Sequence, residues 1–237
     1  MTTFSKSLRI FAEIQNITNS VILRYAETVA ISDSKDMIMR INFEGIGESE
    51  FPEIPLMDSL SSFTSLLKLF SENRKVTFEN PEIFVSEGSL KSSFITDNVA
   101  LMGDFEKDPS QFDKTREVPD VAIFQLSVDD IKTIRQASGV FKDLGDIIVS
   151  CKDGDVSLSL GSTSSFNAKS NTFSKLYADK GSKDFNIAIP VENFKSIPLS
   201  EYSFMVKYNS DRDAYRIMLD CTTMDNNLEI IMTVKAN

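Results

Sequence analysis

The chain contains no histidine, and this absence narrows the chemistry open to it. Imidazole is the commonest general base, the usual zinc ligand and the partner of serine or cysteine nucleophiles, and none of the 237 residues supplies one. Phosphate-binding loops are missing too, because no Walker sequence occurs and Gly45-Ile46-Gly47 is a lone GxG that opens no convincing helix. Asp153-Gly154-Asp155 lacks the other ligands of a calcium loop. We therefore expect a protein that is not an enzyme and needs no metal or cofactor.

Cysteines and long apolar runs are also scarce. Cys151 and Cys221 are the only cysteines, and both fall in predicted strands, where a buried thiol behaves as a small apolar side chain. We expect no disulfide, since reducing compartments disfavour it. The sequence shows neither the roughly 18 apolar residues that span a bilayer nor a basic stretch leading into an apolar signal segment. We expect a soluble intracellular protein without a membrane partner.

The residues that are present describe an acidic protein with a real core. Hydrophobic residues make up 41% of the chain, and the formal net charge is −10. Such a field repels nucleic acid, so any DNA contact must come from a local basic surface.

The first half of the chain alternates one helix with about three strands, twice. Residues 4–16 and 58–70 each gather apolar side chains on one helical face, and Asp58 is well placed as the N-cap of the second helix. Pro52 and Pro55 mark an edge strand, because each proline removes a donor from the ladder. Segments rich in β-branched and aromatic residues predict further antiparallel strands at 20–26, 27–32, 36–43, 74–80, 82–88 and 90–96.

The second half repeats this order after a change in composition. Residues 103–119 hold prolines and charges of both signs, and we expect a loop or linker there. A helix then begins at its N-cap Ser127, with acidic residues in the first turn, and an Asp153-Gly154 turn closes the hairpin that follows. A short helix is expected at 191–196. Strands are predicted at 122–127, 146–151, 155–161, 184–190, 201–208, 213–221 and 227–235, with a less regular strand pair at 166–178.

This repetition predicts two similar domains. Four units of about 50 to 60 residues, each a helix plus about three strands, indicate pseudo-symmetry and α+β architecture with antiparallel sheets. The expected boundaries are 1–103 for the N-terminal domain, 104–119 for the connector and 120–237 for the C-terminal domain.

The predicted helices differ in charge from the rest of the chain. Segments 4–16, 58–70, 128–142 and 191–196 together hold seven basic and five acidic residues, a net +2 that leaves −12 for everything else. Acids in the first turns are explained by the helix dipole. In 128–142 the apolar stripe is Ile131, Ile134, Ser138 and Phe141, and a neighbouring basic stripe holds Lys132, Arg135 and Gln136. For each basic residue alone, a solvated helix face is the simpler explanation. The joint pattern predicts a sequence-independent contact with a phosphate backbone where the helices converge.

The element order, the repetition and the charged helix faces together resemble the DNA polymerase sliding clamps, and above all those of large tailed bacteriophages. The resemblance covers nearly the whole chain. It is carried by LRIFAEIQNITNSVIL at 8–23, the run from PLMDSL to SSFIT at 55–96, LSVDDIKTIRQASGV at 126–140 with the hairpin after it, and DFNIAIPVENFKSIPLSEYSFMVKY at 184–208.

The resemblance implies the DNA clamp fold, in which two similar domains each pack two helices on antiparallel sheets and assemble into a ring around double-stranded DNA. A six-domain ring built from two-domain chains is a homotrimer. Clamps of this kind hold the replicative DNA polymerase on DNA for processive synthesis, are opened by an ATP-driven clamp loader, and in such phages can assist late transcription. A phage-encoded clamp would act in the cytoplasm of the host cell.

The resemblance also assigns roles to residues. The basic residues of the helix faces would line the DNA hole: Lys6, Arg9, Lys68, Lys132, Arg135, Lys142 and Lys195. Apolar residues in and beside the connector would form a groove for partner tails, namely Phe105, Phe112, Val118 and Val121. For these four, pinning the connector to the core is an equally weighted alternative.

Two other functions remain open from the sequence. The first is a non-enzymatic, β-rich structural component of a phage or virion that is acidic and repetitive. The second is a hydrolase that uses paired carboxylates among the 35 Asp and Glu residues, although exposed carboxylates are normally solvated surface.

Overall fold

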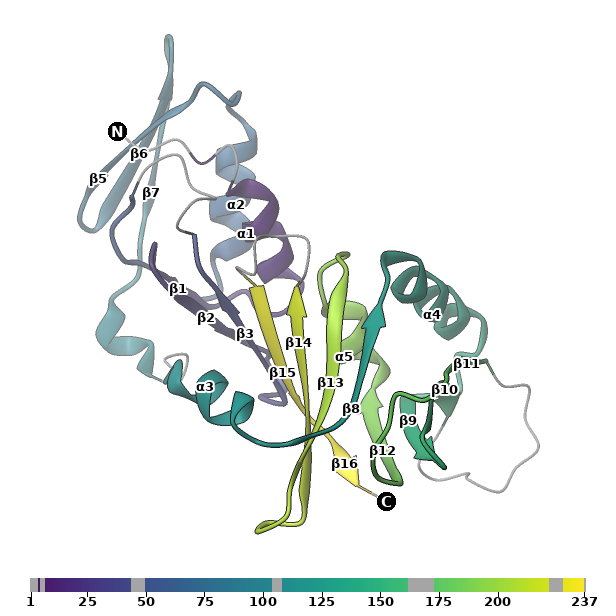
Figure 1. The fold of residues 1–237 in the computed structure, drawn as a ribbon. Coiled ribbons are helices and arrows are strands. Elements are labelled where there is room, and N and C mark those ends of the chain that lie inside the picture. Colours follow the sequence, from purple (N-terminus) through teal and green to yellow (C-terminus); the bar gives the residue numbers. More distant parts are fainter. Residues whose placement is uncertain are drawn as a thin grey trace. The chain divides into compact units, whose positions relative to one another are not determined.

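A computed structural model describes residues 4, 7–43, 50–103, 108–161, 173–221 and 228–236 of the chain. The chain divides into two compact units, Met1–Pro109 and Ser110–Asn237, whose elements are labelled in Figure 1.

The N-terminal unit combines two α-helices with short antiparallel strands. The helices are α1 (Leu8–Gln15) and α2 (Leu60–Lys68), followed later by the 3₁₀-helix η1 (Val99–Leu101). The strands are β1 (Val21–Leu23), β2 (Thr28–Ile31), β3 (Met37–Ile41), β4 (Ile54–Leu56), β5 (Lys75–Glu79), β6 (Glu82–Glu87) and β7 (Leu90–Ile95). Strand β1 pairs with β4, β2 with β3, and β5-β6-β7 form an antiparallel meander.

An aromatic cluster forms the core of this unit. The Phe4 ring lies edge-on to Phe11 and Phe51 at centroid distances of 5.2 and 5.3 Å, and to Phe63 at 6.1 Å. Such edge-to-face pairs place the positive ring edge against a negative ring face. Helix α1 buries its Phe11 side and α2 its Phe63 side, and the two helices pack side by side (Figure 1).

The C-terminal unit has longer strands and three helices. The helices are α3 (Ser110–Arg116), α4 (Val128–Val140) and α5 (Val191–Ser196). The strands are β8 (Asp120–Leu126), β9 (Asp146–Lys152), β10 (Asp155–Gly161), β11 (Ser174–Tyr177), β12 (Phe185–Pro190), β13 (Tyr202–Asn209), β14 (Ala214–Cys221), β15 (Leu228–Thr233) and β16 (Lys235–Ala236).

All described strand pairs of this unit are antiparallel. One sheet has the order β11-β10-β9-β12-β16, and in the other β15, β14, β13 and β8 lie side by side in that order. Between β9 and β10, Asp153 and Gly154 have φ of 53° and 91°, which is the left-handed backbone expected of the predicted Asp-Gly hairpin turn. Cys151 and Cys221 are both buried, and neither is in a disulfide.

Two local predictions were wrong. Asp58 does not cap α2: the N-cap is Ser59, without a side-chain cap bond, and Asp58 instead accepts a 3.0 Å hydrogen bond from Ser20. The backbone amide of Ser61, in the first turn of α2, donates to Asn19 Oδ1 at 2.7 Å. A residue distant in sequence therefore supplies the cap, and no local pattern announces it.

The second error concerns the predicted loop at 103–119. Residues Ser110–Arg116 of this stretch form helix α3, which buries Phe112 and Thr115. Pro109 stands directly before the first helical residue, where a proline costs no helical hydrogen bond. Two buried positions in seven residues are too few to produce a visible apolar period, so composition alone suggested a loop.

Candidate functional site

The helices of the N-terminal unit expose some of the predicted DNA-facing cations. Arg9 on α1 and Lys68 on α2 are exposed, on the sides of the helices away from the buried Phe11 and Phe63. Lys6 lies outside the described residues. This unit thus offers one exposed cation on each of its two packed α-helices.

The C-terminal unit offers exposed lysines that have acidic neighbours on the same helix. Lys132 on α4 lies 3.8 Å from Asp129, and Lys195 on α5 lies 2.8 Å from Glu192, in both cases one turn apart. Exposed pairs of this kind contribute little and are easily exchanged, so a phosphate can compete for either lysine. Lys142 is exposed just beyond the end of α4.

Arg135 departs from the predicted basic stripe. Its guanidinium donates a hydrogen bond to the carbonyl of Ile197, just beyond α5, and the side chain is only half-exposed. Ile131, Ile134 and Ser138 are buried as predicted, while Phe141 is half-buried. Arg135 therefore serves mainly to hold the end of α5 against α4.

The start of α4 is joined to strand β11 through one carboxylate. Ser127 accepts from the Asp130 amide at 3.2 Å, and Asp130 accepts from the Ser127 amide at 3.1 Å, which completes a capping box. The same carboxylate accepts hydrogen bonds from Lys175 and, at 3.2 Å, from the Tyr177 hydroxyl.

This network lowers the pKa of Asp130 and raises the pKa of Tyr177. Burial alone would raise the pKa of Asp130, but the hydrogen bonds from Lys175 and Ser127 outweigh it and hold the pKa below its ordinary value. Burial and the adjacent Asp130 charge raise the pKa of Tyr177. Asp130 is therefore ionised and Tyr177 neutral at neutral pH.

The structure describes three of the four residues predicted to form a partner groove. Phe112 is fully buried and Val121 nearly so, which fits the alternative that they pin the connector to the core. Val118 is half-buried, and Phe105 lies outside the described residues.

Val118 instead lines a cavity of about 410 Å³, here called the α3 pocket. One wall is formed by α3 and by Val118, which lies just beyond the helix. The other wall is the hairpin of β13 and β14. The lining residues are Gln111, Lys114, Thr115, Val118, Lys207, Asn209, Arg212, Ala214 and Arg216.

Lys207 connects the two walls of the α3 pocket. Only 2% of its side chain is exposed, and its ammonium contacts Asp120 at 2.9 Å and the carbonyls of Arg116 and Val118 at 3.2 and 3.0 Å. It is buried because the end of α3 and the residues after it cover this face of β13. Sequence alternation could not reveal this inward lysine.

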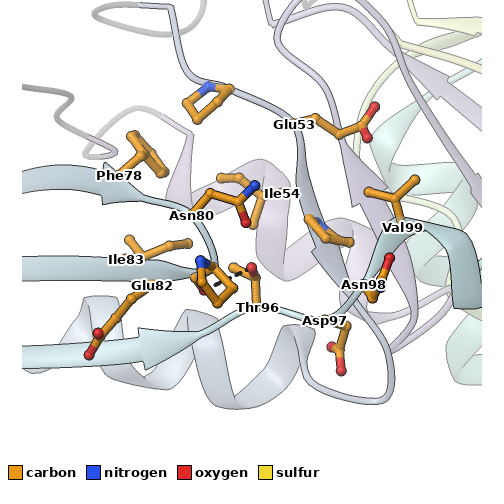
Figure 2. Close-up of a pocket in the computed structure, with 13 residues that line it drawn as sticks. Glu53, Ile54, Phe78, Asn80, Glu82, Ile83, Thr96, Asp97, Asn98 and Val99 are labelled. Atoms are coloured by element: carbon orange, nitrogen blue, oxygen red, sulfur yellow. Dashed lines mark hydrogen bonds between the residues drawn. The ribbon is translucent and has the colours of Figure 1, made fainter.

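The N-terminal unit holds a larger pocket of about 810 Å³ beside β4 (Figure 2). Its lining comes from β4 and the residues before it, the β5–β6 turn and the segment after β7, with Phe78 and Ile83 among the apolar members. Of its carboxylates, Glu53 pairs with Arg24 at 2.7 Å and Asp97 accepts from the Met57 amide at 2.7 Å. Those two carboxylates therefore have structural partners within the fold.

Two sheet edges carry exposed apolar residues. On β7, at one edge of the β5-β6-β7 meander, Leu90 is 52% and Ile95 72% exposed. On β11, at one edge of the five-stranded sheet, Leu176 is 62% exposed. Strand edges with unpaired backbone groups and apolar side chains are templates for pairing with another chain.

Within the described part of the chain, no helix has both the length and the apolar character needed to cross a membrane.

Comparison with known proteins shows similarity in structure only. No protein-family model matches the chain, and no curated protein matches its sequence. The structure of A. fulgidus PCNA bound to the C-terminal region of FEN-1 is similar with a TM-score of 0.69 at 10% identity, covering 100% of this chain and 99% of that one. PCNA from Thermococcus kodakaraensis gives a TM-score of 0.68 at 11% identity, covering 97% and 96%.

Bacterial clamps show the same similarity over part of their length. The Helicobacter pylori beta clamp bound to a DNA ligase peptide gives a TM-score of 0.67 at 11% identity, covering 100% of this chain and 65% of that one. At such identities the likeness establishes the fold alone. The chain has the α+β DNA clamp fold that the sequence predicted.

Proposed function

We propose that the chain is the subunit of a DNA sliding clamp, a non-enzymatic homotrimeric ring that encircles duplex DNA and tethers the replicative polymerase. The observation that carries this proposal is the clamp fold over the full length of the chain. The chain spans only about two thirds of the beta clamp subunit it resembles, as expected of a two-domain subunit that closes a ring in three copies.

The exposed strand edges support assembly into a ring. Edge β7 of one subunit would pair with edge β11 of the next, covering Leu90, Ile95 and Leu176. Because the two edges differ, the contact is head-to-tail, and such contacts give closed rings when the rotation between subunits closes.

The exposed helix cations support contact with DNA. Arg9, Lys68, Lys132, Lys142 and Lys195 stand on or next to helices of a chain whose net charge is −10. Contacts of this kind, without base reading, let a protein stay on DNA and still slide.

Partner recognition is the least localised part of the proposal. A. fulgidus PCNA binds the C-terminal region of FEN-1, and the H. pylori beta clamp binds a DNA ligase peptide. By analogy, this chain would receive tails of the polymerase and of an ATP-driven loader near the connector. The sequence resemblance extends the proposal to a phage protein that acts in the host cytoplasm and supports late transcription.

The ring can be tested on the purified chain. Sedimentation velocity across micromolar concentrations should show a species of three times the 26.5 kDa subunit mass, and negative-stain images should show a hole wider than about 20 Å to admit duplex DNA. Ile95→Asp with Leu176→Asp should shift the population to monomers. Monomers at every concentration of the unmodified chain would reject the ring.

A further inference from the structure

The α3 pocket is built from one face of a helix and one face of a hairpin. Gln111, Lys114 and Thr115 are spaced i, i+3 and i+4 on α3, and Val118 lies two residues beyond the end of the helix; all four line the pocket. On the hairpin, Lys207 stands opposite Arg216, and Asn209 opposite Ala214, in register. Cross-strand partners lie on the same face of a sheet, so these side chains converge on the same space. The small Ala214 side chain leaves that space open.

Positively charged side chains gather in the lining of this pocket. Four of its lining residues are basic and none is acidic, in a chain of net charge −10. Lys207 is neutralised by Asp120. Among the described residues, Arg212 and Arg216 have no acidic partner, and the contact of the Arg216 guanidinium is the neutral Thr115 hydroxyl at 3.2 Å.

The pocket walls are held in place before any ligand arrives. Lys207 fixes the carbonyls after α3 to the sheet, and Asn209 Oδ1 accepts from the Arg212 amide at 3.1 Å. The Tyr208 hydroxyl donates to Asp213 at 2.8 Å across the hairpin tip. A site whose walls are already ordered loses less entropy on binding.

We propose that the α3 pocket binds the carboxylate of an acidic residue in a peptide segment of a partner protein. The planar guanidinium groups of Arg212 and Arg216 match the two oxygens of a carboxylate, and charge-assisted bonds of this type are the stronger ones. Val118 and Ala214 offer a small apolar surface for a neighbouring side chain of the peptide. This site gives a place and a chemistry to the partner binding proposed near the connector and rests on that part of the proposed function, but it depends neither on the ring nor on DNA contact.

The surroundings of the pocket favour a peptide over a nucleic acid. Asp113 and Glu117 are exposed on and after α3, and Asp211 and Asp213 are exposed on the hairpin tip. Duplex DNA carries a negative charge about every 1.7 Å of its axis, so a strand following the pocket would meet these carboxylates as well. A single carboxylate on an otherwise neutral or apolar segment avoids that repulsion.

A peptide selection tests the proposal on the full chain. A random 12-residue displayed library is selected in parallel against three proteins: the unmodified chain, Arg212→Gln with Arg216→Gln, and the control Lys152→Gln with Lys180→Gln. The control removes the same charge from exposed positions of the same unit. The unmodified chain and the control should both enrich peptides with Asp or Glu beside an apolar residue, and the arginine variant should not. Enrichment without acids, or no enrichment at all, would overturn the proposal.

Binding of the best selected peptide then gives the magnitude. Fluorescence anisotropy should show that Asp→Asn or Glu→Gln in the peptide weakens binding about tenfold, as expected for a hydrogen bond to a charged group. The arginine variant should show a similar loss, and the two losses should not add, because both remove one interaction. Additive losses would place the carboxylate elsewhere and reject the site.

Two further measurements separate the remaining outcomes. A 20-nucleotide single strand and its duplex serve as competitors, and arginine-dependent displacement of the peptide by either would reassign the pocket to nucleic acid. Sedimentation of the same variants measures ring assembly independently of peptide binding. A failure of the peptide selection can therefore be distinguished from a failure of the ring to assemble. Thermal unfolding of the arginine variant should match the control, since both pairs are exposed surface substitutions.

Discussion

The two units reach the same helix-on-sheet arrangement by different local means. In the N-terminal unit, α2 begins without a side-chain cap of its own, and Asn19 supplies one from a distant part of the chain. In the C-terminal unit, α4 begins with a complete capping box formed by Ser127 and Asp130. Similar architecture therefore does not require similar local signals, and only the second helix start is written into consecutive residues.

The cores of the two units also differ: one is aromatic and the other mainly aliphatic. The N-terminal unit centres on Phe4, whose ring contacts Phe11, Phe51, Phe63 and Phe78. The C-terminal unit fills its five-stranded sheet with aliphatic side chains, such as the fully buried Leu158. Packing of a few large rings holds the short strands of the N-terminal unit together. In the C-terminal unit, regular pairing between strands does so.

The largest expected effect tests the aromatic core. Phe11→Ala removes a fully buried ring that contacts Phe4, Phe43 and Phe63, and it should lower the free energy of unfolding of the N-terminal unit by about 3–5 kcal/mol. Urea unfolding followed by near-ultraviolet circular dichroism measures this. Leu158→Ala is the matched cavity in the other unit, with an expected loss of about 2–5 kcal/mol. A loss below about 1 kcal/mol at Phe11 would contradict the central role of the rings.

The capping network of α4 should give the next effect. Asp130→Ala removes the acceptor for the Ser127 amide, Lys175 and Tyr177, and should cost about 2–3 kcal/mol of stability. Asp129→Ala, at an exposed position of the same turn, should stay within about 0.5 kcal/mol. Equal losses would show that the helix dipole, and not the network, matters there.

The same carboxylate predicts a pH dependence. The pKa of Asp130 in the fold lies below its ordinary value of 3.8. Its contribution is therefore complete above that value and is lost as the pH falls through the lower, folded-state pKa. Chemical unfolding between pH 2 and about 6 should show a smaller acid-induced loss for Asp130→Asn than for the unmodified chain. Superimposable pH profiles would remove Asp130 as a source of acid sensitivity.

The distant cap of α2 should have a smaller effect. Asn19→Ala leaves the Ser61 amide without its acceptor and should cost about 1 kcal/mol, the usual value for a lost N-cap. Asp58→Asn is the comparison, because the sequence favours Asp58 as the cap while the structure assigns it to Ser20. It should change stability by less than about 0.5 kcal/mol, because asparagine keeps the acceptor and tolerates a φ of 50°. The reverse ranking would restore Asp58 as the cap.

The smallest effect per residue is expected on DNA. Lys68→Glu and Lys132→Glu change one exposed helix position in each unit. If both helices face DNA, each substitution should lower the slope of log affinity against log salt by roughly 0.9, the value for one phosphate contact. Lys152→Glu, exposed at the end of β9, should leave the slope unchanged. A change in one unit only would show that the two helix pairs are not equivalent.

Periodic features were predictable from the sequence, and features made by distant residues were not. The N-cap at Ser127, the Asp153-Gly154 turn and the order of most helices and strands along the chain follow from local chemistry. The Asn19 cap required chain folding to bring it to α2, and helix α3 was hidden because only Phe112 and Thr115 face inward.

The candidate sites show the same limit. Arg9, Lys68 and Lys132 are exposed as their helical positions predict, but Arg135 is drawn to the Ile197 carbonyl, which no helical wheel can show. The α3 pocket escaped prediction because its two walls, α3 and the β13–β14 hairpin, are remote in sequence.

Asp130 holds the first turn of α4 and the edge strand β11 with one side chain. The carboxylate therefore connects the start of α4 mechanically to strand β11. A force that pulls β11 away from its sheet is borne in part by the start of α4, and loosening of that helix start frees the strand. Strain at this sheet edge and order at this helix end are therefore coupled, and protonation of Asp130 can change both.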